Sequence, residues 1–259
     1  MNDKYTLEDI KRVQHRLLEM AIAIRDVLDK HNVPYFIPYG TLLGAVRHKG
    51  FIPWDDDFDL YLFDDTYEEG VNYLKDELPS GMFLEYFGTE PKYFHAWAHV
   101  KDENSITDCD LYPQDSLYTH KGICVDLYRT KLIKDDEEKL YRAEEHKKYL
   151  ERRLAFGFIQ DIKAVEHKIS ELTYFINAEK ERLSSLRVRN NRDMYAFQIF
   201  YDDRLYVDEV FPLKKYRFEN TEFYGPQKAE ALLTRCYGDY MQLPPIEKRK
   251  PHYSKVVFL

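Results

Sequence analysis

Four carboxylates crowd into five consecutive positions of this chain, directly before a short apolar stretch. They lie in the run Pro53-Trp54-Asp55-Asp56-Asp57-Phe58-Asp59, which Leu60-Tyr61-Leu62-Phe63 follows. Like charges a few ångströms apart repel each other and raise each other's pKa, so the run is costly without a counter-charge. A divalent cation would remove that cost. The run therefore indicates either a metal site for phosphate chemistry or a solvated acidic turn.

The composition indicates a folded protein that does not bind nucleic acid. Of the 259 residues, 44% are apolar, and 22 Tyr and 16 Phe argue against disorder. The net charge of −8 disfavours nonspecific binding to nucleic acid or anionic lipid. An acidic protein can still bind a nucleotide where metal ions and a few local cations reverse the field.

The cysteines and the apolar stretches indicate an intracellular protein. Cys109, Cys124 and Cys236 are far apart, without the spacing of zinc ligands or of a redox pair. The polar N-terminus shows no signal peptide, and no stretch approaches the roughly 20 apolar residues of a membrane span. We expect a cytoplasmic protein without a transmembrane segment, and leave open a peripheral contact with the inner face of the membrane.

The periodicity of apolar residues predicts one α/β unit covering residues 1–259. A first helix is expected from Thr6, with Asp9 in a capping-box position, to about His31 before Pro34. Strands are predicted over 35–39, 58–63, 82–87, 93–101, 123–128, 216–218 and 222–224. Further helices are predicted over 42–47, 66–78, 227–237 and, as two long helices with a break near Gly157, 135–186. We expect a mixed sheet flanked by helices, with a helical insertion over 134–190 and a C-terminal part, 191–259, that completes the site.

If the acidic run leads into a strand, the strand decides to which face each of its side chains points. Side chains alternate along a strand, so Asp57 and Asp59 would share one face and Asp56 would point away. Asp55, extended before them, is a plausible third ligand. Carboxylate oxygens of this kind suit Mg²⁺, which proteins hold with one or two carboxylates plus substrate phosphates and water.

Two further sequence motifs, one before and one after the acidic run, form a known order of motifs with it. Gly40-Thr41 follows a predicted strand and precedes a helical turn, where a phosphate can approach the backbone closely. Asp126 is the one charge in the apolar run Ile123-Cys124-Val125-Asp126-Leu127 and is the natural third acid. A glycine-hydroxyl pair, then Asp-x-Asp, then a third carboxylate is the pattern of the nucleotidyltransferase fold. Each element alone is commonplace, but their order and spacing together favour a metal site.

A longer block carries a family resemblance. Tyr39-Gly40-Thr41-Leu42-Leu43-Gly44-Ala45-Val46-Arg47-His48-Lys49-Gly50-Phe51-Ile52 and the acidic run after it resemble the signature block of the LicD family of phosphotransferases, which is similar to the fukutin-type transferases. Weaker matches follow in order at Val100-Lys101-Asp102-Glu103-Asn104-Ser105, Gly122-Ile123-Cys124-Val125-Asp126, Tyr237-Gly238-Asp239-Tyr240, Leu243-Pro244-Pro245 and Lys248-Arg249. The chain departs from the family after Asp126, where Leu127-Tyr128-Arg129-Thr130-Lys131 replaces the usual Ile-Phe-Pro-x-Asp.

The resemblance implies the transfer of a phospho-substituent, most often phosphocholine, from a CDP-linked donor to a hydroxyl of a glycan or lipid-linked glycan acceptor. Such acceptors belong to teichoic acid, lipopolysaccharide or another cell-surface polysaccharide. One or two Mg²⁺ ions, or Mn²⁺, would be held by Asp55, Asp57, Asp59 and Asp126, and CMP would leave. Besides completing the metal site, Asp126 could also orient or deprotonate the acceptor hydroxyl as general base.

Several other residues are candidates for binding the substrates. Gly40, Thr41, Arg47, His48 and Lys49 would contact donor phosphates, although the basic residues could simply offset the acidic run. A quaternary ammonium would need aromatic faces, and the candidates are Tyr93, Phe94, Trp97, Tyr112, Tyr118 and Tyr128. His95, Trp97 and His99 alternate on a predicted strand, where ordinary packing is more common than a two-histidine metal site. His252 is a further candidate for phosphate.

Two other functions remain compatible with the sequence. The fold would also permit true nucleotidyl transfer, in which a nucleoside monophosphate moves to a small acceptor and pyrophosphate leaves. A catalytically silent scaffold of glycan assembly is the alternative from another class, and the retention of every acidic position speaks against it.

Overall fold

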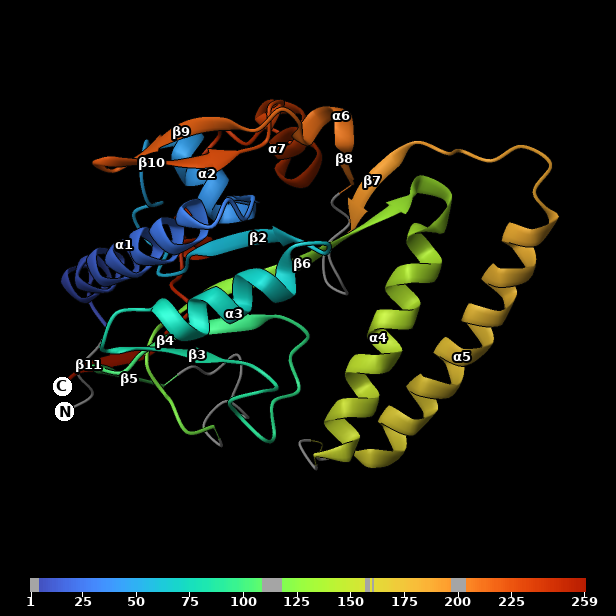
Figure 1. Cartoon of the computed structure of the whole chain (residues 1–259), viewed down its shortest axis with the longest axis horizontal. Coiled ribbons are helices and arrows are strands. Elements are labelled where there is room, and N and C mark those ends of the chain that lie inside the picture. The colour runs from blue at the N-terminus through green and yellow to red at the C-terminus, as the bar shows by residue number, and fades with distance from the viewer. Residues whose placement is uncertain (1–4, 109–117, 157–158, 160, 197–203) are drawn as a thin grey trace.

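The structure is a computed structural model and describes residues 5–108, 118–156, 159, 161–196 and 204–259 (Figure 1). Its helices are α1 (Leu7–Lys30), α2 (Tyr39–Arg47), α3 (Tyr67–Glu77), α4 (Glu138–Ala155), α5 (Ile162–Ser185), α6 (Val207–Val210) and α7 (Ala229–Tyr237). Its strands are β1 (Tyr35–Phe36), β2 (Asp59–Phe63), β3 (Met82–Glu85), β4 (Ala98–Asp102), β5 (Ser105–Asp108), β6 (Cys124–Lys134), β7 (Asp193–Ala196), β8 (Leu205–Tyr206), β9 (Lys214–Phe218), β10 (Thr221–Gly225) and β11 (Lys255–Phe258). In this part of the chain no helix is both long and apolar enough to cross a membrane.

A mixed sheet forms the centre of the molecule, as the sequence predicts. Its strand order is β1-β2-β6-β4-β3, and β7 and β8 extend it from the second half of β6. β2 and β6 run parallel, whereas β4 runs antiparallel to both β6 and β3. The β9-β10 hairpin and the antiparallel pair of β5 with the distant strand β11 make two smaller sheets. The expected α/β class is confirmed.

The first helix begins where the sequence predicts. The backbone N–H of Asp9 donates to the Thr6 hydroxyl (3.2 Å), and the Thr6 N–H donates to the Asp9 carboxylate (2.8 Å), so both halves of the capping box are present. The buried stripe of α1 then carries Val13, Leu17 and Ile24, each fully enclosed in the main core.

Helices α1 and α3 cover one face of the sheet and leave the acidic residues on the other. In Figure 1 both helices lie in front of β2 and β6. A Cβ atom added to Gly70 of α3 would lie 3.1 Å from the Leu62 side chain, so Leu62 faces this helix. Because side chains alternate along a strand, Asp59 and Tyr61 face the opposite side.

The two long helices of the middle segment are present and pack against each other. In Figure 1, α4 and α5 form an antiparallel pair beside the sheet, entered from β6 and left towards β7. Tyr149 and Leu150 of α4 pack on a buried aromatic cluster with Tyr93, Phe94 and Tyr118. The predicted break near Gly157 lies outside the described residues, and the division of the chain into one domain with an insertion stays a prediction.

Three strands depart most from their predicted bounds, two of them shorter and one longer than expected. The strand predicted over 35–39 ends at Phe36, because Pro38 caps α2 and the helix already begins at Tyr39. The strand predicted over 93–101 begins only at Ala98, since the Tyr93 hydroxyl donates to the Trp97 carbonyl (2.6 Å) and closes a loop there. Conversely, β6 continues to Lys134 because β7 pairs with its second half.

Candidate metal and substrate site

Three carboxylates meet at one end of the parallel strands β2 and β6. Asp57, Asp59 and Asp126 each place one oxygen within 4.8 Å of the other two. The strand register sets Asp59 directly opposite Asp126. The Asp126 N–H donates to the Phe58 carbonyl (3.0 Å), so the pairing extends one residue before β2 and brings Asp57 to the same end. We call these residues the open acid group.

The open acid group has the electrostatics of a cation site. Burial and then the neighbouring Asp126 raise the pKa of Asp57 to about 7, while burial and Asp57 hold the pKa of Asp59 well above its usual range. The Asp59 Oδ1 atom is buried and has no hydrogen-bond partner among the described residues. Three convergent carboxylates with an unsatisfied oxygen are the ligand set that a divalent cation such as Mg²⁺ takes.

Asp126 differs from its two partners. Burial alone would raise its pKa, but the charge and hydrogen bond of His99, with a hydrogen bond from Tyr128, lower the pKa overall. The His99 Nε2 atom lies 3.0 Å from Oδ1, and the Tyr128 hydroxyl donates to Oδ2 at 3.0 Å. The Tyr128 hydrogen bond therefore holds Oδ2, whereas among the described residues Oδ1 is held only by its ion-pair contact with the His99 ring.

Asp55 and Asp56 form a second group, with His252, which we call the anchored acid group. Asp56 is fully buried, and its carboxylate accepts the backbone N–H groups of His252 (2.7 Å) and Tyr253 (3.2 Å). The His252 ring lies 3.2 Å from Asp56 and 3.7 Å from Asp55. The structure thus separates Asp55 from the three other predicted metal ligands, and Asp56 points away from them.

The predicted glycine-hydroxyl pair lies beside both acid groups, in the first turn of α2 rather than in a turn before it. The Thr41 hydroxyl accepts the N–H of Asp59 (3.0 Å), so it fixes the backbone of a proposed metal ligand. A Cβ atom on Gly40 would lie 3.0 Å from Asp55 Oδ2, which shows how closely the two segments approach.

The predicted basic residues lie in two different environments: Arg47 and His48 contact each other and are half-buried, whereas Lys49 is exposed. Arg47 donates to the Tyr240 carbonyl (2.6 Å) and to the His48 ring (3.0 Å). The Lys49 ammonium bonds to the Val46 carbonyl and is otherwise exposed. Sequence reasoning did not single out Arg249, whose guanidinium lies 5.0 Å from the Trp54 ring centre and so adds a cation beside His48 and Arg47.

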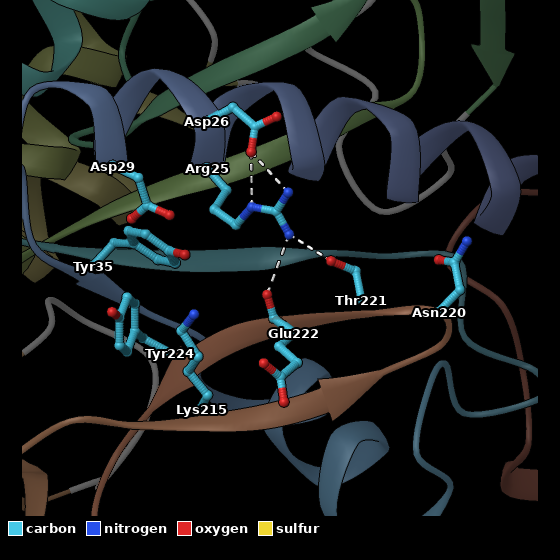
Figure 2. Close-up of a pocket in the computed structure, with 9 residues that line it drawn as sticks. All are labelled: Arg25, Asp26, Asp29, Tyr35, Lys215, Asn220, Thr221, Glu222 and Tyr224. Atoms are coloured by element: carbon cyan, nitrogen blue, oxygen red, sulfur yellow. Dashed lines mark hydrogen bonds and ion pairs between the residues drawn. The ribbon is translucent and has the colours of Figure 1, made fainter.

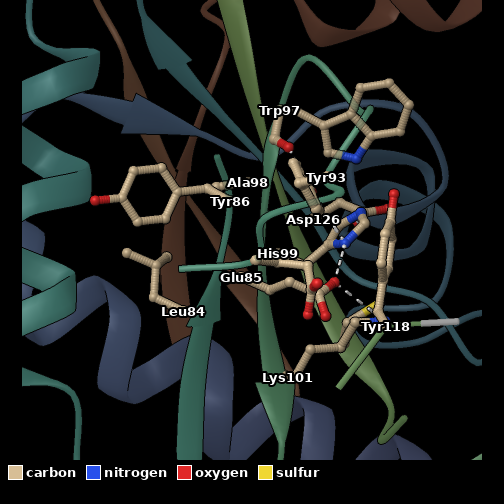
Figure 3. Close-up of polar contacts among 12 residues, drawn as sticks. Leu84, Glu85, Tyr86, Tyr93, Trp97, Ala98, His99, Lys101, Tyr118 and Asp126 are labelled. Atoms are coloured by element: carbon tan, nitrogen blue, oxygen red, sulfur yellow. Dashed lines mark hydrogen bonds and ion pairs between the residues drawn. The ribbon is translucent and has the colours of Figure 1, made fainter. Parts of the chain in front are cut away.

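A row of ionisable side chains crosses four adjacent strands at one level. Asp59 of β2 pairs with Asp126 of β6, Asp126 pairs with His99 of β4, and His99 pairs with Glu85 of β3. Figure 3 shows His99 between Glu85 and Asp126. Burial would lower the pKa of His99, but the charge of Asp126 and the hydrogen bonds with Asp126 and Glu85 raise it to about 9.

A row of aromatic rings lies next to the ionisable row on the same face. Tyr61 pairs with Tyr128, two residues along from Asp59 and Asp126. The Tyr128 ring lies 5.8 Å from Tyr61 and 5.2 Å from Trp97, and Tyr39 lies 5.4 Å from Tyr61 and hydrogen-bonds to its hydroxyl. Tyr39 has the left-handed φ of 42°, which is uncommon for a non-glycine residue and aims its ring at this row.

The remaining aromatic candidates lie elsewhere. Tyr93, Phe94 and Tyr118 belong to the buried cluster under α4, and Tyr112 lies outside the described residues. The prediction that His95, Trp97 and His99 alternate along one strand is wrong, because residues 95 and 97 precede β4. The His95 ring still packs against the His99 ring, with 5.0 Å between the ring centres. Among the described residues, neither histidine belongs to a group able to hold a metal.

A hollow of about 430 Å³ lies between α1 and the β9-β10 hairpin, away from the two acid groups (Figure 2). Its main cation, Arg25, already donates to Asp26 (2.7 Å), the Thr221 hydroxyl (2.5 Å) and the Glu222 carbonyl (3.3 Å). No predicted site residue lines this hollow, and its hydrogen bonds join the hairpin to the helix.

Comparison with known proteins finds two kinds of similarity, one to the domain of a family and one to whole chains. Residues 32–131 match the family model described as "LicD/FKTN/FKRP, nucleotidyltransferase domain", and the match includes the open acid group. Over 99% of both chains the protein is 26% identical to the lipopolysaccharide cholinephosphotransferase LicD of Haemophilus influenzae. It is also 26% and 25% identical to uncharacterized proteins of Rickettsia prowazekii and Rickettsia typhi, of which it spans 65% and 58%. The protein is therefore similar to the LicD family both in this domain and, through the Haemophilus protein, over its full length.

Proposed function

We propose that the protein transfers phosphocholine from a CDP-linked donor to a hydroxyl of a cell-surface glycan precursor, with a divalent cation, and releases CMP. The open acid group is the observation that carries the proposal, because phosphoryl transfer depends on positioning and charge neutralisation. The similarity to a lipopolysaccharide cholinephosphotransferase supports phosphocholine and a lipopolysaccharide-type acceptor. Assembly of such an acceptor would place the reaction on the cytoplasmic side of the membrane.

In this proposal Asp57, Asp59 and Asp126 hold Mg²⁺. The ion would supply neutralisation of the donor's pyrophosphate and of the charge that develops on the leaving CMP. Thr41 keeps Asp59 in place through its backbone N–H. Because His99 and Tyr128 lower the pKa of Asp126, this carboxylate is a weak base, and we assign it to ligation rather than to removing the acceptor's proton.

The basic residues beside the acid groups are suited to the donor's phosphates. Arg47 and Arg249 lie beside His48 and Trp54, and no carboxylate forms an ion pair with either arginine in the described part of the chain. Burial and then the charge of Arg47 lower the pKa of His48, so His48 is a neutral hydrogen-bonding partner here and the two arginines are the cations. Cations without an acidic partner favour a bound anion, and arginine can hold phosphate through two parallel hydrogen bonds.

The aromatic row is suited to the transferred group. Tyr39 and Tyr128 are partly exposed beside the open acid group, whereas Tyr61 and Trp97 are buried and pack against them on the same face of the sheet. Trimethylammonium groups bind to aromatic faces by cation–π attraction, worth about 0.5–2 kcal/mol. The row would therefore select choline over an uncharged alcohol.

The direct test is a screen for CMP release from CDP-choline, CDP-ethanolamine, CDP-glycerol and CDP-ribitol, with and without Mg²⁺. We expect release from CDP-choline that needs the ion and that Asp59→Asn abolishes. Asp65→Asn, at the exposed far end of β2, is the matched control and should keep wild-type activity. Full activity of Asp59→Asn would refute the mechanism.

The same screen separates the alternatives. Pyrophosphate release with transfer of a nucleotide would indicate nucleotidyl transfer, which the description of the family model also allows. A silent scaffold would release nothing, and neither metal nor CDP-choline would raise its melting temperature, as a ligand of the native state must.

Two substitutions test the aromatic row separately from the metal. Tyr128→Leu should raise the KM for CDP-choline by about 3- to 30-fold, as loss of a cation–π contact predicts, and should change the KM for CDP-glycerol less. Tyr128→Phe keeps the ring but loses the hydroxyl that holds Asp126, so its KM should stay near wild type while kcat falls. Equal effects of Tyr128→Leu on both donors would exclude the row from choline recognition.

A further inference from the structure

Glu85 is a buried acid for which the proposed mechanism has no role so far. Its side chain is fully enclosed on β3, and its Oε1 atom has no hydrogen-bond partner among the described residues. Its Oε2 atom lies 3.2 Å from His99 Nδ1 and 3.9 Å from the Lys101 ammonium. A buried carboxylate is costly unless it is paired, so its position calls for an explanation.

His99 links this acid to the open acid group. Its Nε2 atom lies 3.0 Å from Asp126 Oδ1, while Nδ1 faces Glu85. The Tyr93 hydroxyl is also 3.2 Å from Nδ1 but donates its proton to the Trp97 carbonyl. A neutral imidazole has one N–H, whereas two carboxylates at its two nitrogens require two donors, so the ring bridges the acids as an imidazolium.

We propose that Glu85 and His99 are positioning residues that fix Asp126 in the orientation in which it binds the divalent cation. Glu85 acts through His99, because it touches the ring and none of the open acid group. This inference rests on the metal-binding part of the proposed function. Partners that orient metal ligands in this way typically change metal affinity or activity by about 10- to 100-fold when they are lost.

The experiment measures Mn²⁺ binding to the full chain by calorimetry, together with Mg²⁺-dependent CMP release. We expect His99→Gln and Glu85→Ala each to weaken Mn²⁺ binding by about 10- to 100-fold. Glu85→Gln should stay near wild type, because its amide oxygen can still accept the Nδ1 proton. The double variant His99→Gln/Glu85→Ala should bind no more weakly than His99→Gln alone, since Glu85 acts through the ring.

His31→Gln is the matched control. His31 also contacts a carboxylate, Glu77, at 2.6 Å, but it lies at the end of α1, outside both acid groups. It should leave Mn²⁺ binding unchanged. If His99→Gln fails to fold, the contrast between Glu85→Ala and Glu85→Gln still decides the proposal.

The outcomes separate this inference from the proposed function. Unchanged or tighter Mn²⁺ binding in His99→Gln, or in Glu85→Ala, would overturn it and leave His99 as a mere counter-charge. Additive losses in the double variant would also overturn it. If the wild type binds Mn²⁺ and the variants weaken it, but no CDP-linked donor releases CMP, the proposed function fails and the positioning role stands. A wild type that binds no Mn²⁺ would overturn both.

Discussion

Each acid group takes two carboxylates from the same short stretch, residues 55–59, and the two groups have opposite relations to the rest of the protein. In the anchored acid group, Asp56 is enclosed and accepts two backbone N–H groups from the C-terminal segment. In the open acid group, Asp59 is equally enclosed, yet its Oδ1 atom has no hydrogen-bond partner in the described structure. Asp56 thus links distant segments of the chain, whereas Asp59 keeps an oxygen atom that could bind a cation.

The comparison shows that carboxylate density alone does not define a metal site. What separates Asp56 from Asp59 is whether the protein itself satisfies the charge. Two N–H donors stabilise an ionised carboxylate, whereas like charges raise the cost of ionising its neighbour. Substitutions should therefore divide into those that weaken the fold and those that remove metal-dependent chemistry.

The largest expected effect is on activity, at Asp59. Asp59→Asn should lower Mg²⁺-dependent CMP release by about 100-fold or more, because stabilisation by a bound ion is worth several kcal/mol. Asp55→Asn should lose less, since Asp55 lies with His252 in the anchored acid group. Initial rates at saturating Mg²⁺ measure both. If both substitutions lowered CMP release equally, Asp55 would have to be counted as a metal ligand like Asp59.

The next effect is on stability, at Asp56. Asp56→Ala leaves the N–H groups of His252 and Tyr253 without their acceptor, and breaking a buried charged contact costs about 3–5 kcal/mol. Urea denaturation should show this loss in the free energy of unfolding. Asp59→Asn, measured in the same way without metal, should be at least as stable as wild type, because it removes a repelling buried charge. A stable Asp56→Ala would contradict the anchoring role.

A smaller effect is the pH dependence of the metal-free protein. The folded-state pKa of Asp57 is raised to about 7, so the folded state binds its proton more tightly than the unfolded chain does. Stability from this proton is complete at low pH and is lost as the pH rises through about 7. The melting temperature in chelator should therefore fall by several degrees between pH 5 and 8. Added Mg²⁺ should flatten that slope, and an unchanged slope would argue against the open acid group as the binding site.

The smallest effect is expected at His252. His252→Ala removes a half-exposed ring from Asp56 but keeps the two backbone N–H donors, so the free energy of unfolding should fall by about 1 kcal/mol or less. Mn²⁺ affinity should change little. A loss of Mn²⁺ binding comparable to that of Asp59→Asn would show that the two acid groups act as one site.

The sequence predicted the local parts of the fold well, because their signals are local. The capping box at Thr6 and the apolar spacing of α1 depend on residues a few positions apart, and the structure contains both. The strand ends were less predictable. β4 starts late because a hydrogen bond from Tyr93 closes a loop, and β6 runs on because β7 lies beside it. Both causes are tertiary contacts.

The candidate site shows the same division. The order of Gly40-Thr41, Asp57-x-Asp59 and Asp126 indicated a set of acids, and the structure brings Asp57, Asp59 and Asp126 together. The alternation of His99 and Lys101 with the apolar Ala98 and Val100 was the available signal for the rest of the ionisable row. Without the strand register, that signal could not say which acid His99 meets.

By itself, the sequence determined which residue types the protein offers for phosphate chemistry and which family it resembles, because spacing along the chain carries that information. Only the tertiary structure decided how those residues are used. The parallel pairing of β2 with β6 places Asp59 beside Asp126, and antiparallel β4 and β3 add His99 and Glu85 at the same level. The C-terminal segment packs against Asp56, which already points away from the other acids, and two of its backbone N–H groups satisfy the charge of that carboxylate.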